Sequence, residues 1–244
     1  MYMYYFRILA CALFVFIVPI LLISSSVLLV INAPLIYSYG FERYEIDERT
    51  GIEYNELINA AGQIVEYFNN GADNIVVSIV VKGILVKNLY NDREIAHMRD
   101  VKQLVKGVYS VQVLSVGYLA IFMTLGFAVY RWQFTTLTTR LAGFGGILTV
   151  GMVIVVVLGS VFNFDQLFLT FHMLSFSNDL WQLDPRTDYL IVMFPQEFFF
   201  YGTFCIIAVT IFLAIFISVL SMVILRGGYR LRHSVRCNSL PKFS

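Results

Sequence analysis

The sequence predicts an integral membrane protein, mainly α-helical, with four transmembrane helices and an extracytoplasmic α+β cap. Three observations predict this class. The 244 residues are 59% apolar and only 14% charged, with a mean hydropathy of +0.75, and a soluble domain of this composition would expose large apolar patches. Four apolar runs each reach the roughly 20 helical residues that cross a hydrocarbon core. All 16 acidic residues fall in two of the segments between these runs.

The four runs contain no Asp, Glu or Lys, and they cover residues 6–32, 108–130, 141–163 and 198–225. A helix satisfies its own backbone hydrogen bonds in lipid, so helices are the expected structure for such runs. The first run is longer than a signal-peptide core and has no clear A-x-A site at its end. We therefore expect it to stay in the protein as a membrane helix.

Basic residues without acidic neighbours predict the orientation of the spans. They occupy the ends of the chain and the short connection 131–140, as Arg7, Arg131, Arg140, Arg226, Arg230, Arg232, Arg236 and Lys242. Cytoplasmic loops carry an excess of Lys and Arg. The loop 131–140 and the tail 226–244 are thus predicted to be cytoplasmic, as are both termini. Residues 33–107, the cap, and residues 164–197 then face the extracytoplasmic side.

Within the cap, residues 54–68 have apolar side chains near helical spacing and end before Asn69-Asn70-Gly71, which predicts an amphipathic helix. Residues 75–86 are rich in β-branched side chains and too short to span a membrane. They favour a strand or a strand pair, with a buried helix as the competing interpretation.

The last part of the cap predicts a helix that continues into the second span. Asn91 and Glu94 have the spacing of a capping box. In a helix that begins there, His97 shares one face with Val101 and Leu104, the face expected to point into the bundle. Asp100 is close to one turn after His97 and within reach of its ring.

The second extracytoplasmic segment begins with a Phe- and Leu-rich stripe over residues 164–176, typical of a helix at the membrane interface. His172 lies on this predicted helix. A polar stretch follows, with Pro185 marking a turn, and it contains Asn178, Asp179, Trp181, Asp184, Arg186 and Asp188. One histidine thus lies beside each of two spans, on the same predicted side of the membrane.

These stretches resemble a family of bacterial membrane proteins, the lipoprotein intramolecular transacylases, also described as a domain of unknown function. The resemblance rests on E-I-x-H-M-x-D-V at 94–101, F-H-x-L-x-F-x-N-D-x-W at 171–181 and D-x-L-I-x-x-F-P at 188–195. It implies a membrane acyltransferase that moves the sn-2 acyl chain of a diacylglyceryl lipoprotein to the amine of its N-terminal cysteine. The product is a lyso-form lipoprotein. The implied partners are bacterial diacylglyceryl lipoproteins and outer-leaflet lipid, without nucleic acid, and the oligomeric state stays open.

The residues themselves fit such a reaction. Ester-to-amide transfer is downhill, and the sequence has no phosphate-binding loop and no metal-ligand spacing such as HExxH, so we expect neither a cofactor nor a metal. An imidazole can take the proton of the attacking amine, and an imidazolium can protonate the leaving oxygen. His172 as base and His97 as acid or oxyanion stabiliser are the expected catalytic residues.

Carboxylates near the histidines are expected to fix their tautomers, as in a catalytic triad. Asp100 and Asp184 are the catalytic candidates for this role, with Asp179 as the alternative to Asp184. Arg99 and Arg186 could stabilise the oxyanion or hold a headgroup. The predicted substrate-binding residues are Arg99, Asn178, Asp179, Trp181 and Arg186.

Two other functions compete with this one. The first is a metal-dependent membrane hydrolase that uses His97, His172, Asp179 and Asp184 as ligands, although their spacing matches no standard site. The second is a non-enzymatic assembly or sensing protein whose cap binds an extracellular partner. In that case both histidines would be dispensable.

Overall fold

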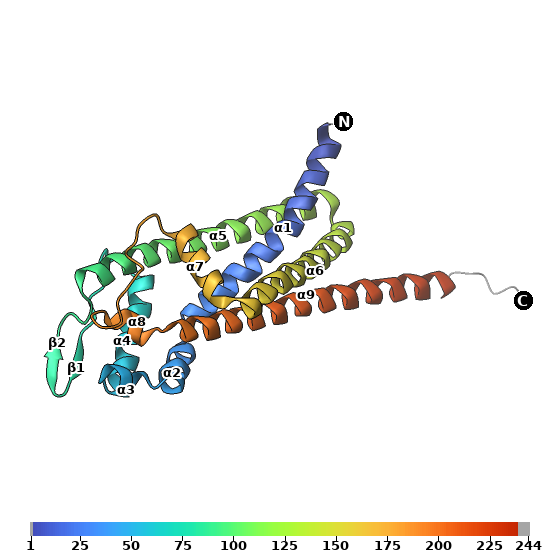
Figure 1. Cartoon of the computed structure of the whole chain (residues 1–244). Coiled ribbons are helices and arrows are strands. Elements are labelled where there is room, and N and C mark those ends of the chain that lie inside the picture. The colour runs from blue at the N-terminus through green and yellow to red at the C-terminus, as the bar shows by residue number, and fades with distance from the viewer. Residues whose placement is uncertain (1, 239–244) are drawn as a thin grey trace, which may run out of the picture. The chain divides into compact units, whose positions relative to one another are not determined.

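The computed structural model of the chain describes residues 2–238, so the end of the predicted cytoplasmic tail, 239–244, lies outside the described residues. Four helices are long and apolar enough to cross a membrane, which confirms the predicted class. They are α1 (Tyr2–Ile31), α5 (Asp92–Tyr130), α6 (Gln133–Phe162) and α9 (Gln196–Asn238) (Figure 1). The two-stranded sheet and the shorter helices all lie in the predicted extracytoplasmic segments.

The chain divides into two compact units, and the first comprises Met1–Ile23, Val111–Val155 and Ala208–Ser244. The described residues of this unit form parts of the four long helices and the turn between α5 and α6, packed around a small apolar cluster of Phe14, Val18, Leu22, Leu141 and Ala214. Gly145 allows a close approach of α6 to α1, because a Cβ there would lie 2.6 Å from Cβ of Val18. Small residues at such contacts are typical of helices packed in a membrane.

The second unit comprises Ser24–Ser110 and Val156–Ile207 and holds the larger apolar core. Its short elements are α2 (Pro34–Arg43), α3 (Ile46–Thr50), α4 (Tyr54–Asn69), β1 (Ile79–Val81), β2 (Ile84–Val86), α7 (Phe164–Ser175) and α8 (Tyr189–Met193). Phe41, Ile46, Leu57, Ile79 and Met193 are completely or almost completely buried in this core. The core therefore joins elements from both predicted extracytoplasmic segments.

The predicted helix over 54–68 is α4, and its inward face carries the buried residues Leu57, Ala60, Ala61 and Ile64. The strand pair expected in 75–86 is an antiparallel hairpin in which Val81 pairs with Ile84. Its two turn residues, Lys82 and Gly83, both have positive φ, 50° and 79°. A two-residue hairpin turn of this kind matches the right-handed twist of the strands.

Candidate active site

His97 lies in the first third of α5. The capping box is present: the Asn91 backbone N–H donates to Oε2 of Glu94 at 2.8 Å, and the Glu94 N–H donates to Oδ1 of Asn91 at 3.1 Å. These bonds fix where α5 begins and so the face on which His97 lies. The His97 side chain is 7% exposed. Among the residues that the structure describes, its Nδ1 is buried without a hydrogen-bond partner, and such an atom needs a partner from elsewhere.

His172 lies in the last turn of α7, a helix that Asn163 begins by accepting a hydrogen bond from the Gln166 N–H. Nδ1 of His172 is 2.8 Å from the Phe168 carbonyl oxygen. A carbonyl can only accept, so Nδ1 carries the proton and Nε2 holds the lone pair when the ring is neutral. Burial lowers the pKa of His172 from its usual value, and the bond to Phe168 opposes this shift. The ring is therefore a neutral base at physiological pH.

The two imidazoles are close together, with ring centroids 6.4 Å apart and planes at 30°. Aromatic side chains surround the pair. The ring of Phe176 is 5.2 Å from that of His97 and 5.7 Å from that of His172. Trp181 and Phe168 contact His172 at 5.0 and 4.3 Å. The arrangement provides two proton-transfer groups in surroundings from which water is partly excluded.

Residues 178–190 are held against the start of α5 by hydrogen bonds at four places. Asn178 Nδ2 donates to Oδ2 of Asp100 at 2.9 Å, and Arg93 Nη2 donates to the Asp179 carbonyl at 2.8 Å. Two further bonds lie toward the helix N-terminus, from Asn91 Nδ2 to Oδ1 of Asp188 at 2.8 Å and from the Leu190 N–H to Oε1 of Glu94 at 2.6 Å. This network positions Trp181 against His172.

Two of these carboxylates are buried. Glu94 is 1% exposed and Asp188 is 6% exposed. Burial alone would raise the pKa of Asp188, but hydrogen bonds from the Asp184 N–H, Asn91 and Thr187 outweigh it, so its pKa is lowered. Asp188 is therefore an ionised acceptor that fastens the turn to α5.

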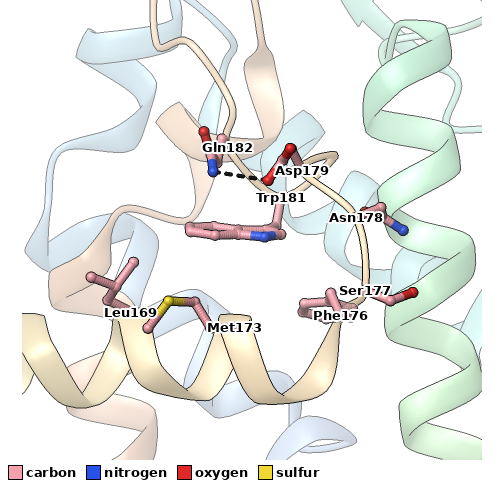
Figure 2. Close-up of a pocket in the computed structure, with 8 residues that line it drawn as sticks. All are labelled: Leu169, Met173, Phe176, Ser177, Asn178, Asp179, Trp181 and Gln182. Carbon is pink, nitrogen blue, oxygen red and sulfur yellow. Dashed lines mark hydrogen bonds between the residues drawn. The ribbon is translucent and has the colours of Figure 1, made fainter.

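A cavity of about 440 Å³ adjoins the histidine pair. Its lining residues all come from α7 and the following loop: Leu169, Met173, Phe176, Ser177, Asn178, Asp179, Trp181 and Gln182. Figure 2 shows the Trp181 indole between the hydrogen-bonded Asp179–Gln182 pair and the Leu169 and Met173 side chains of α7. Because Trp181 and Phe176 also contact His172, the cavity lies next to that ring.

The remaining predicted site residues have other partners. Arg99 is exposed and donates to Oδ1 of Asn74. Asp184 and Arg186 form an exposed ion pair at 2.8 Å, and hydrogen bonds from Arg186 lower the pKa of Asp184. Asp100 accepts from Asn178, and the tautomer of His172 is held by a backbone carbonyl instead of a carboxylate.

The four residues expected as metal ligands in the alternative hydrolase, His97, His172, Asp179 and Asp184, do not form a metal-binding group. No group of three or more His, Cys, Asp or Glu side chains in the described part of the chain is arranged to hold a metal ion. Asp184 is paired with Arg186, and Asp179 Oδ1 accepts from Gln182.

Several site residues were not expected from the sequence. Phe168 and Phe176 belong to the stripe that is expected at the membrane interface, yet both contact His172. The cavity lining also includes four residues for which the sequence did not predict a role in the site: Leu169, Met173, Ser177 and Gln182. For Phe168 the signal is its spacing from His172, since residues four apart lie on one helix face. Phe176 lies just beyond the end of α7, so helical spacing does not indicate its contact with His172. The sequence indicates only the capping role of Glu94, which in the structure also accepts from the Leu190 N–H.

Comparison with known protein families identifies one family. Residues 12–199 match the family described as lipoprotein intramolecular transacylase Lit. A protein of Aquifex aeolicus (strain VF5), described as uncharacterized, is 26% identical over 221 residues, which is 85% of this chain and 95% of the relative.

Among solved structures, the fold is similar to that of the membrane integral lipoprotein intramolecular transacylase Lit from Bacillus cereus. The TM-score is 0.77 at 20% identity, over 93% of this chain and 99% of that one. A structure of the same Bacillus protein with one histidine changed to alanine has a TM-score of 0.74 at 19% identity, over 94% and 98% of the two chains.

Proposed function

The chain belongs to the lipoprotein intramolecular transacylase family and is a membrane acyltransferase that acts on lipoproteins. We propose that it works by general acid–base catalysis at His172, with His97 as the oxyanion stabiliser. In the proposed reaction the sn-2 acyl chain of a diacylglyceryl lipoprotein moves to the α-amine of its N-terminal cysteine. One observation carries the proposal: the ring centroids of the two imidazoles lie 6.4 Å apart, with Nδ1 of His172 bound to a backbone carbonyl and Nδ1 of His97 without a hydrogen-bond partner among the described residues.

His172 is the proposed base. The neutral amine attacks the carbonyl carbon of the sn-2 ester and forms a tetrahedral intermediate with a positively charged nitrogen and an oxyanion. Nε2 of His172 takes one proton from that nitrogen. The bond between the carbonyl carbon and the sn-2 oxygen then breaks, and the proton on His172 passes to this oxygen. An ester is consumed, and an amide and a hydroxyl are formed.

His97 is the proposed oxyanion stabiliser. Its side chain is buried beside His172, and two adjacent buried imidazolium ions would be costly. A neutral His97 can instead donate an N–H hydrogen bond to the oxyanion that develops on the former carbonyl oxygen. The unpartnered Nδ1 of His97 supports this role, because a bound substrate would supply the missing partner.

The proposed site faces the extracytoplasmic side, with both termini in the cytoplasm. The distribution of charge supports this orientation, since all 16 acidic residues lie in the segments 33–107 and 164–197. A diacylglyceryl lipoprotein anchored in the outer leaflet would then present its N-terminal cysteine at the level of the site.

The test is the structure of the N-terminal lipopeptide of one reporter lipoprotein. The host should lack other N-acylating enzymes, and the protein should be wild type, His97→Ala or His172→Ala. Transfer within one molecule leaves the mass unchanged, so fragmentation must locate the acyl chain on nitrogen. Loss of a proton-transfer group costs about 10²–10⁴ in rate, and loss of one donor to an oxyanion costs about 10²–10³, so both variants should yield almost no N-acylated product. A free amine with wild-type protein, or full acylation by both variants, would overturn the proposal.

A further inference from the structure

We infer that the cavity beside Trp181 is a recognition subsite for the protonated α-amine of the substrate's N-terminal cysteine, with Asp179 as its counter-ion. The inference rests on the proposed function and adds how the acceptor amine is bound before it reacts. The α-amine is mostly protonated at neutral pH, since its pKa in water is near 7.7–8.0. The enzyme therefore meets its acceptor as an ammonium ion.

The charge of the cavity fits a cation. Among the eight described residues that line it, Asp179 is the only one with a formal charge. Its Oδ1 accepts a hydrogen bond from Nε2 of Gln182, a neutral donor, at 3.2 Å. The one ion pair recorded in the described part of the chain is Arg186–Asp184, so Asp179 has no paired cation of its own there. An acyl chain in the same place would desolvate this carboxylate without compensation.

The aromatic wall of the cavity fits the same ligand. Trp181 offers the most favourable aromatic face for a cation, and Figure 2 shows its indole below the Asp179–Gln182 pair. A carboxylate and an indole on one cavity together provide a charged hydrogen-bond acceptor and a cation–π surface. Ser177 and Asn178 add neutral polar groups to the lining.

The subsite lies beside His172, the proposed base, so an amine bound there is close to the group that accepts its proton. Trp181 is 5.0 Å from the ring of His172, so a group held on the indole lies next to the base. Two hydrogen bonds hold the Asp179 carbonyl, from Arg93 Nη2 at 2.8 Å and from the Gln182 N–H at 3.2 Å. Two charged side chains of α5 thus hydrogen-bond this loop, Arg93 at Asp179 and Asp100 at Asn178.

The proton balance of the reaction is then complete. The bound ammonium releases one proton to solvent at the cavity mouth, and the neutral amine attacks the ester carbon. His172 carries the second proton from nitrogen to the sn-2 oxygen, and the third stays on the amide nitrogen. The cavity contributes recognition only, and no further reactant is required.

The experiment measures binding without turnover. The probes are two lipopeptides in which ether linkages replace both glycerol esters, one with a free N-terminal amine and one N-acetylated. Neither can transfer an acyl chain. Their affinities for the purified full-length protein in detergent at pH 6.5 are compared for wild type and Asp179→Asn. Asp47→Asn, which removes an exposed carboxylate on α3, is the matched control.

We expect wild-type protein to bind the free-amine probe about tenfold more tightly than the acetylated probe. Asp179→Asn should reduce this preference to about twofold or less, and Asp47→Asn should keep it. The affinity for the acetylated probe should be the same in all three proteins, which shows that the site is intact. Trp181→Leu should reduce the preference partly. An equal preference in Asp179→Asn and wild type, or none in wild type, would overturn the subsite.

His172→Ala separates this inference from the proposed function. The variant should lose turnover of the ester substrate but keep its preference for the free-amine probe. If turnover persists in His172→Ala while the probe preference still depends on Asp179, the assignment of the base is wrong and the amine subsite stands.

Discussion

At the scale of single residues, the proximity of His97 and His172 could be predicted from the sequence, but the surroundings of this pair could not. Each of the two histidines lies in a local motif beside a span, and in the structure their ring centroids are 6.4 Å apart. The bond from His172 to the Phe168 carbonyl depends on the ring rotamer at the end of α7. The pairing of Asp184 with Arg186 depends on the turn that begins at Asp184. Neither leaves a signal in residue spacing.

The protonation state of His172 makes a prediction for the pH profile. Burial lowers the pKa of this ring below its usual value of about 6.5. A base must be unprotonated, so the lowered pKa keeps His172 active as the pH falls. The substrate amine, with its higher pKa, should be protonated first. We expect kcat/KM in detergent to fall about tenfold per pH unit from about pH 7.5 downward, steepening only where His172 itself is protonated. A rate that rises on acidification would contradict the proposed base.

Substitution of the two candidate carboxylates, Asp100 and Asp184, should reduce activity much less than substitution of the histidines. Asp184→Asn removes only an exposed ion pair, and such pairs contribute little, so steady-state kcat/KM should fall about fivefold or less. Asp100→Asn keeps an oxygen that can accept from Asn178 and should also have a modest effect. A loss of 10²-fold or more in Asp184→Asn, in the range of a proton-transfer group, would show that this carboxylate takes part in the chemistry.

At the scale of elements, the capping box and the long amphipathic segments could be predicted because their signals are local. The pattern at Asn91 and Glu94 predicted the start of α5, and the apolar spacing of 54–68 predicted α4. The short helices α2, α3 and α8 were not predicted. They contain ten, five and five residues, and helices this short depend on tertiary packing for stability.

Glu94 gives a prediction at this scale, because one buried carboxylate serves two elements. It caps α5 through the Asn91 N–H and accepts from the Leu190 N–H at the start of α8. Glu94→Ala leaves both donors without their acceptor, so it should destabilise the protein by about 3 kcal/mol. Glu94→Gln should cost less, since one amide oxygen remains. Activity should fall with both, because the loop that carries Trp181 loses an anchor.

The measurement is thermal unfolding in detergent alongside kcat/KM. Glu66→Ala is the matched control, since Glu66 is exposed on α4 and its loss should change the unfolding free energy by about 0.5 kcal/mol or less. Equal stability of Glu94→Ala and Glu66→Ala would show that the hydrogen bonds of Glu94 contribute nothing.

At the scale of the whole molecule, the composition was enough to predict an integral membrane protein. Hydropathy located four spans because a hydrocarbon core accepts only long apolar helices in such a chain, and four such helices are present. The packing of the second unit could not be predicted. Its core joins Phe41 and Ile46 to Met193 and Phe198 across about 150 residues of sequence, and no local pattern encodes contacts between such distant segments.

The orientation of the molecule is the last prediction, and it follows from the asymmetry of charge. Acidic residues are confined to 33–107 and 164–197, whereas the segment 131–140, which comprises the turn between α5 and α6 and the start of α6, contains only basic charges. The positive-inside rule therefore places this segment in the cytoplasm. In a variant with Cys11, Cys205 and Cys237 replaced by alanine, single cysteines are introduced as Asn70→Cys, Asn178→Cys or Gln133→Cys. A membrane-impermeant maleimide should label the first two in intact cells, because both positions are exposed in the predicted outward segments. Gln133→Cys should react only after the cells are lysed. Protection of both outer positions, with labelling of Gln133→Cys from outside, would invert the topology and place the histidine pair on the wrong side for an outer-leaflet substrate.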